Sequence, residues 1–204
     1  NAPIVTPIPF DFSACGHSLC IIDSGASHAD LTDEYAAITQ ELKAVCGFFG
    51  KGYLRDVSET QFYERIADVR KAAGDRAVLR AIHVFEENKR VDKQTAALLQ
   101  NDFGAFLEQV TLSGNSSWLY LQNVVPAGAA AKQEVAYALA VARQLLGGRG
   151  ACRVHGGGFA GTIQAFVPND MLETFCEKME NALGRGSCHI MSIRKEGGIV
   201  LEEC

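Results

Sequence analysis

Residues 153–167 read RVHGGGFAGTIQAFV. Three glycines stand in a row, a fourth follows Phe159 and Ala160, and an apolar run continues to Val167. The apolar segments on both sides predict strands, at 151–155 and 162–167, so the glycines connect two strands. Taken alone, this pattern is most simply a hairpin with a glycine-rich turn.

A phosphate-binding role for this loop is the alternative. No Gly-Lys-Ser/Thr follows the glycines, so the loop is not a Walker A loop, and a strand rather than a helix follows, unlike the dinucleotide-binding fingerprint. Three successive glycines nevertheless exceed what common hairpins require. Arg149, Arg153 and His155 also place cationic or protonatable groups nearby, as an anion site would. A plain turn, an anion site, and a loop that supports a phosphate loop elsewhere are the three hypotheses.

The overall composition argues against several classes of partner. The 204 residues are 48% hydrophobic and 21% charged, with a formal net charge of −5, which gives no basic footprint for nucleic acid. No apolar run has the length of a membrane span. Seven irregularly spaced cysteines include no CxxC pair, and the five histidines show no metal-ligand spacing. We therefore expect a cytoplasmic protein with no nucleic acid, membrane or metal site.

Helical periodicity covers much of the chain outside the glycine loop. The expected helices are 32–47 with Thr32 as its cap, 58–71, 75–99, 103–112, one through 135–145, and one from 169–170 to 184 with Asp170 and Glu173 as a capping box. Residues 113–117 are expected to form a polar loop. Further strands are expected at 18–22, 188–193 and 199–201. The fold class is therefore α+β, with a mostly antiparallel sheet and helices on one side.

A second motif suggests a different chemistry. Asp23-Ser24-Gly25 follows an apolar strand, as in retroviral-type aspartic proteases, in which two such aspartates from two lobes or subunits activate water. Asp-Ser-Gly is also a common turn sequence, and proteases of that type consist almost entirely of strands. The helical character of this chain favours a strand-to-helix turn, with the protease kept as an alternative.

Together, these stretches resemble the C-terminal half of galactokinases, in the GHMP small-molecule kinase superfamily. The glycine loop resembles the family's Gly-Gly-Gly-Phe-Gly-Gly motif, and IIDSGASHADLTDEYAAITQEL (21–42) is similar to a segment with His-Ser/Ala-Leu and then Glu-Tyr. LRDVSE (54–59) and RAIHVFEENKRV (80–91) follow in the same order, so the resemblance extends from Leu19 to about Leu201. Ala160 stands where the family has Gly, and GNSSWLYLQNV (114–124) replaces an acidic stretch. These departures concern the choice of sugar.

The resemblance implies a ferredoxin-like GHMP kinase C-terminal domain over residues 1–204, with Asn1-Ala2 interpreted as a cloning scar. It implies that the complete enzyme transfers the γ-phosphoryl group of ATP, with Mg²⁺, to the C1 hydroxyl of galactose or a related sugar. The catalytic residues and the nucleotide loop would lie in an absent N-terminal domain, itself a partner of this one. This chain alone would then be inactive, with no catalytic residue or metal ligand of its own. The alternative function is a sugar- and ATP-sensing regulatory protein on the same scaffold.

The resemblance also assigns roles to individual residues. Tyr35 matches a tyrosine that contacts the sugar, where its phenol can donate a hydrogen bond. The residues that match the glycine motif would pack beneath the nucleotide-phosphate loop of the other domain; they are Gly156, Gly157, Gly158, Phe159 and Gly161.

Overall fold

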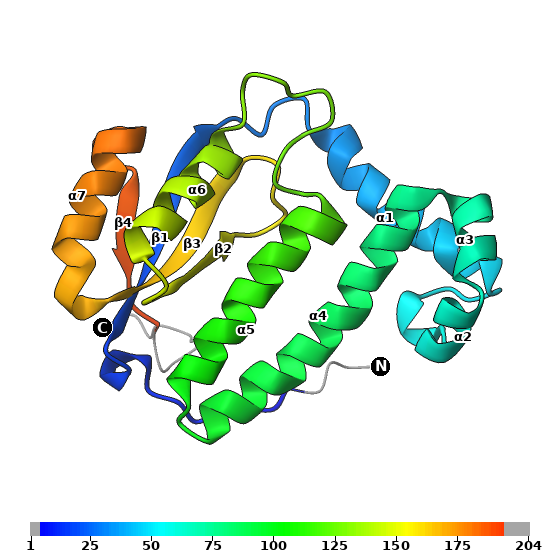
Figure 1. Cartoon of the computed structure of the whole chain (residues 1–204), viewed down its shortest axis with the longest axis horizontal. Helices are drawn as coiled ribbons and strands as arrows, with labels where there is room; N and C mark the ends of the chain where they lie inside the picture. Colours follow the sequence, from blue (N-terminus) through cyan, green and yellow to red (C-terminus); the bar gives the residue numbers. More distant parts are fainter. Residues whose placement is uncertain (1–4, 194–204) are drawn as a thin grey trace, which may run out of the picture.

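Four antiparallel strands form one sheet with the strand order of a ferredoxin-like fold. The computed structural model describes residues 5–193. The strands are β1 (His17–Ala26), β2 (Ala151–Val154), β3 (Gly161–Pro168) and β4 (Cys188–Met191), in the order β2-β3-β1-β4 (Figure 1). The two central strands pair from His17 opposite Pro168 to Asp23 opposite Thr162. The expected α+β class is confirmed, and the strand expected at 199–201 lies outside the described residues.

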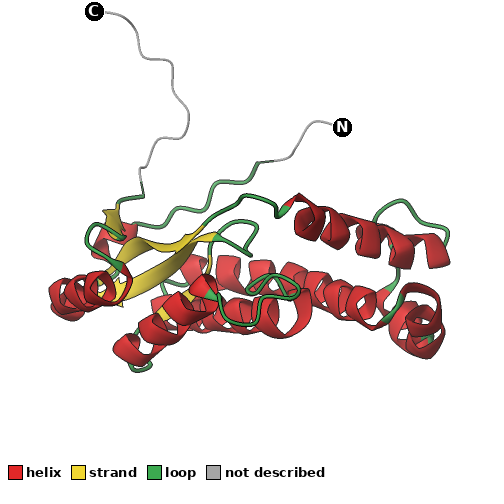
Figure 2. Cartoon of the chain, turned by 90° about the horizontal axis from the view of Figure 1, so that it is seen from above, coloured by secondary structure: helices red, strands yellow, loops and turns green. Residues whose placement is uncertain are grey.

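Two helices, α6 (Glu134–Leu146) and α7 (Leu172–Leu183), cover one face of the sheet. In Figure 2 these helices lie below the strands. Alternate residues of β3, namely Ile163, Ala165 and Val167, are fully buried against this layer. Because side chains alternate between the faces of a strand, this pattern fixes which side of β3 faces the helices.

A helical insertion between β1 and α6 extends away from the sheet (Figure 1). Its elements are α1 (Thr32–Phe48), α2 (Glu59–Glu64), α3 (Ile66–Ala73), α4 (Asp75–Leu99), α5 (Phe103–Ser116) and the π-helical turn η3 (Ser117–Leu121). The helices α1 to α4 enclose a second core around Phe62, Val69 and Phe85. Helix α5 connects the insertion to the sheet because it packs along β2.

The polar loop expected at 113–117 is wrong, because this stretch continues α5 into η3. The Ser113 hydroxyl donates to the Glu87 carboxylate at 2.6 Å, and the Ser116 hydroxyl bonds to His83 at 2.9 Å. Both serines therefore find hydrogen-bond partners on the neighbouring helix α4. Gly114 permits the close approach of α5 to β2, since a Cβ there would lie 3.0 Å from the Cys152 carbonyl oxygen.

Three local expectations about helix ends also need correction. The helix expected at 58–71 is divided at Arg65 into α2 and α3. Leu31, rather than Thr32, occupies the N-cap position of α1, and no side chain caps it. The capping box at Asp170 does not form, because Met171 takes the cap position of α7 and the Asp170 carboxylate pairs with Arg149 at 2.6 Å.

Candidate functional site at the glycine loop

Three loops meet at one end of the sheet, at the top of Figure 1. They are residues 27–31 after β1, residues 122–133 after η3, and the glycine loop 155–160 between β2 and β3. Residues 122–133 are joined to the glycine loop directly, by the bond between Asn123 and Gly157. Residues 27–31 are joined to it through Tyr35, which bonds to both His28 and Gly158. Segments far apart in the sequence therefore build this end of the molecule together.

Asn123 holds the glycine loop from one side through two hydrogen bonds. The side-chain amide of Asn123 donates to the Gly157 carbonyl at 3.0 Å, and the backbone carbonyl of Asn123 accepts from the Phe159 amide at 2.5 Å. Gly158, with φ of +82°, lies so close that a Cβ there would be 2.1 Å from the Asn123 carbonyl oxygen. Only glycine fits this approach without strain, both because of its backbone conformation and because of the contact.

Tyr35, on the first turns of α1, holds the same loop from the other side. Its hydroxyl donates to the Gly158 carbonyl at 2.7 Å, and His28 Nδ1 lies 3.1 Å from the same hydroxyl oxygen. The Tyr35 ring meets Phe159 edge-on, with centroids 5.5 Å apart, and a Cβ on Gly157 would lie 2.8 Å from the ring. Burial raises the pKa of Tyr35, so its phenol keeps the proton that it donates.

The base of the loop is fixed to the end of β1. The Ser24 hydroxyl donates to the Gly161 carbonyl at 2.6 Å. A Cβ on Gly161, where φ is +75°, would lie 2.6 Å from His28 Nε2. The Asp23 carboxylate accepts from the Gly25 amide at 2.9 Å, as in a common Asx turn. The Asp-Ser-Gly motif is thus a structural turn beside the loop, and the largely helical fold does not fit the protease alternative.

Of the loop residues that the sequence singled out, Gly157, Gly158 and Phe159 contact Tyr35, and Gly161 lies beside His28. Asn123, His28 and Ser24 also hold the loop, and none of them was predicted for this site. The His28 position matched the histidine of the family pattern, which was the one available signal. Asn123 follows Gln122, a residue in the left-handed conformation that ends η3, and no local sequence pattern predicts that turn.

The two arginines expected at an anion site are both paired with acidic side chains. Arg149 pairs with Asp170 instead, and Arg153 faces Glu87 with its guanidinium 3.9 Å from the carboxylate. His155 Nδ1 bonds to the Thr162 hydroxyl at 2.9 Å. The Phe159 and Ala160 amides are also used within this region, which leaves fewer backbone donors at the loop for a phosphate.

A buried polar network lies behind this site, between α1, α4 and η3. The fully buried Arg80 donates to the Leu121 carbonyl at 3.1 Å and to the Glu41 carboxylate at 2.8 Å. One turn further along α4, His83 is buried, and desolvation lowers its pKa to about 4. Arg80 therefore anchors the end of η3, two residues before Asn123.

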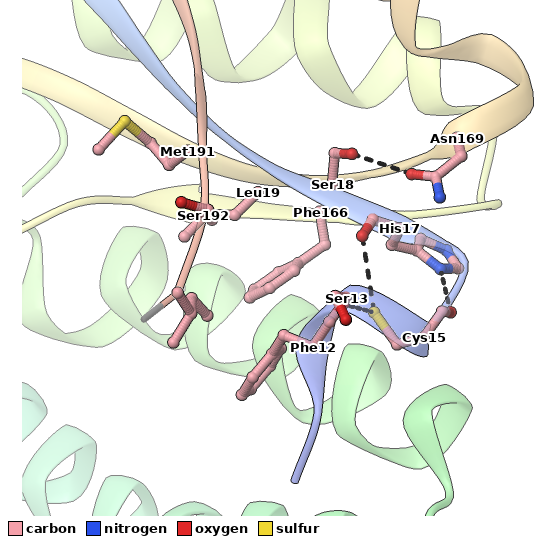
Figure 3. A pocket seen from close by; sticks show the side chains of 11 residues that line it. Phe12, Ser13, Cys15, His17, Ser18, Leu19, Phe166, Asn169, Met191 and Ser192 are labelled. Carbon is pink, nitrogen blue, oxygen red and sulfur yellow. Dashed lines mark hydrogen bonds between the residues drawn. The ribbon is translucent and has the colours of Figure 1, made fainter. Parts of the chain in front are cut away.

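A separate hollow of about 280 Å³ opens at the other end of the two central strands (Figure 3). Phe12, His17 and Phe166 are among the side chains that line it. His17 pairs with Pro168 at the end of β3 that is remote from Gly161. This hollow is consequently not part of the glycine-loop site.

Comparison with known proteins identifies the family. No protein-family model matches the sequence. A galactokinase of Actinobacillus pleuropneumoniae is 33% identical over 168 residues, and one of Glaesserella parasuis is 34% identical over the same length; each match covers 82% of this chain. The chain belongs to the galactokinase family. It matches the C-terminal part of these proteins and spans 40% of their length.

Solved structures agree on the fold of this galactokinase-family chain. The Lactococcus lactis galactokinase complexed with galactose superimposes with a TM-score of 0.67 at 21% identity, over 91% of this chain and 46% of that one. The L. major mevalonate kinase in complex with R-mevalonate gives 0.51 at 11% identity, over 92% of this chain and 44% of that one. Both matches share the α+β fold of this chain, so the expected fold class is confirmed. Within residues 5–193, no helix is long and apolar enough to cross a membrane.

Proposed function

We propose that this chain forms one wall of the substrate cleft in a galactokinase that phosphorylates the C1 hydroxyl of galactose with ATP. Family membership supports a sugar kinase, and the L. lactis relative was solved with galactose. The observation that carries the proposal is the grip of Tyr35 and Asn123 on the glycine loop. Phosphoryl transfer depends mainly on positioning and charge stabilisation, and a loop held from both sides is a preorganised surface for that purpose.

Tyr35 would contact the sugar only as a hydrogen-bond acceptor. The hydroxyl proton is already donated to the Gly158 carbonyl. A phenol has one proton and two lone pairs, so toward a sugar hydroxyl Tyr35 would accept a hydrogen bond rather than donate one. His28, 3.1 Å away, would compete for the same oxygen or hold it in place. Tyr35 therefore links sugar contact to the position of the glycine loop.

The described residues around the loop do not by themselves fit MgATP. Arg149 and Arg153 are paired with Asp170 and Glu87, and the Phe159 and Ala160 amides are occupied. We therefore assign the binding of ATP and Mg²⁺ to the part of galactokinases that this match does not cover. The loop residues Gly156, Gly157, Gly158, Phe159 and Gly161 would pack beneath the phosphate-binding segment of that part. The isolated chain would then bind no nucleotide and catalyse no transfer.

A panel of sugars tests the proposal in the full-length protein that carries this chain. We expect ATP-dependent formation of a sugar 1-phosphate from galactose, detected by ³¹P NMR, and no product from the 204-residue chain alone. Binding of galactose and ATP without turnover would instead support the sugar-sensing alternative. Turnover by the isolated chain would refute the division of roles proposed above.

A further inference from the structure

Three cysteines that are far apart in the sequence meet on the helix-covered face of the sheet. Cys20 lies on β1, Cys176 on α7 and Cys188 at the start of β4, on the left of Figure 1. Their sulfur atoms all lie within 4.8 Å of one another, and the Cys188 thiol donates to Cys176 Sγ at 3.3 Å. Cys188 pairs with Ile22, two residues from Cys20, so both cysteines point to the same face.

The three sulfurs are close enough to share one central atom. Three atoms no more than 4.8 Å apart all lie within about 2.8 Å of a common point, and zinc–thiolate bonds of about 2.3 Å indicate the distance that a thiol-bound atom needs. A planar site would need shifts of at most roughly half an ångström at each sulfur, and an atom held above the plane needs the sulfurs to move closer together. Cys20 is fully buried, whereas Cys176 and Cys188 are partly exposed, so an incoming atom can reach the cluster from their side.

The number of ligands and the charge around the three cysteines decide which thiol-binding atom fits the cluster. Within residues 5–193 the group contains three cysteines and no fourth Cys, His, Asp or Glu, whereas structural zinc takes four ligands. The cluster lies in the apolar core between the sheet and α7, and the charged residue acting on both Cys176 and Cys188 is the acidic Glu180. Three thiolates around Zn²⁺ or Cu⁺ would leave net negative charge in this core, which is costly without a cation.

We propose that Cys20, Cys176 and Cys188 form a binding site for trivalent arsenic, taken up as arsenous acid. Three As–S bonds form while three As–O bonds and three S–H bonds break. Each leaving hydroxide departs with a thiol proton as water, so no electron is transferred and the bound site is neutral.

Native mass spectrometry of the protein with arsenite, in a phosphine reductant, tests this site. We expect one arsenic per chain with the loss of three hydrogens, together with a raised melting temperature, because the ligand binds the folded state. The control Cys15→Ser changes a thiol outside the cluster and should bind as the parent does. Cys176→Ser and Cys188→Ser, at partly exposed positions, should each weaken binding at least a hundredfold.

Several results would overturn the proposal. These are no arsenic uptake by the parent, a mass that shows the loss of only two hydrogens, or undiminished binding by folded Cys176→Ser. Displacement of arsenic by an equal concentration of Zn²⁺ would contradict the argument from charge. The outcome is independent of sugar phosphorylation, because none of the three cysteines belongs to the glycine-loop site.

Discussion

Replacing Gly158 with alanine tests whether the glycine loop is held as tightly as its contacts indicate. Alanine in the left-handed region costs about 1–2 kcal/mol. The added Cβ would lie 2.1 Å from the backbone oxygen of Asn123, so the two segments must separate. Separation would break the Phe159-to-Asn123 backbone bond and the Asn123-to-Gly157 side-chain bond, each worth roughly 1 kcal/mol. The expected loss of unfolding free energy is about 3 kcal/mol.

Gly156 provides the matched control, because it shares the backbone conformation without the contact. Its φ is +69°, and a Cβ there would have no neighbour within 4 Å. Gly156→Ala should therefore lose only the conformational part, about 1 kcal/mol. For a domain of this size we expect a melting temperature lowered by about 6–12 °C for Gly158→Ala and about 2–4 °C for Gly156→Ala. Equal losses of unfolding free energy in the two variants would refute the close contact between Asn123 and the loop.

Three further predictions concern the residues around the site. Tyr35→Phe keeps the ring against Phe159 but leaves the Gly158 carbonyl without its donor, so urea unfolding should show a loss of about 1–2 kcal/mol; an unchanged midpoint would show that this bond is not formed. Burial lowers the pKa of His83 to about 4 in the folded protein. As pH falls below about 6.5, the His83 imidazole is therefore protonated in the unfolded chain but not in the folded one. Unfolding free energy should therefore fall by about 2 kcal/mol between pH 7 and pH 5, and His83→Gln should flatten that part of the profile; equal slopes would contradict a neutral, buried His83. Gly114→Val would force α5 away from β2, with an expected loss of about 2 kcal/mol in thermal unfolding, whereas a loss below 0.5 kcal/mol would mean that the interface adapts.

Regular periodicity predicted the main elements well. The helix expected at 75–99 has these bounds in the structure, and the two strands that flank the glycines lie where expected. Ser113 and Ser116 favoured the wrong prediction of a loop, since polar residues near a glycine usually indicate a loop. Their partners, Glu87 and His83, are about 30 residues away, so local sequence could not show that these hydroxyls are satisfied within a helix pair.

The site was predictable only as separate parts. The glycine motif and Tyr35 were both recognisable by resemblance, but the bond between Tyr35 and Gly158 joins residues 123 positions apart. Asn123 had no local pattern at all, and Arg149 and Arg153 suggested an anion site that their acidic partners remove. Such pairings depend on how the sheet and the insertion pack together, which periodicity does not encode.

Steady-state kinetics of Gly157→Val in the full-length protein, with Gly52→Val as the control, test whether the glycine loop positions ATP for transfer to galactose. A Cβ on Gly157 would lie 2.8 Å from the Tyr35 ring, whereas one on Gly52 would have no neighbour within 4 Å. We expect the parent and Gly52→Val to phosphorylate galactose equally well. Gly157→Val should remain folded but lose at least tenfold in kcat/KM for ATP, since about 1.4 kcal/mol of lost positioning suffices for that factor. A parent without galactose phosphorylation, or a Gly157→Val variant with unchanged kinetics, would contradict this expectation.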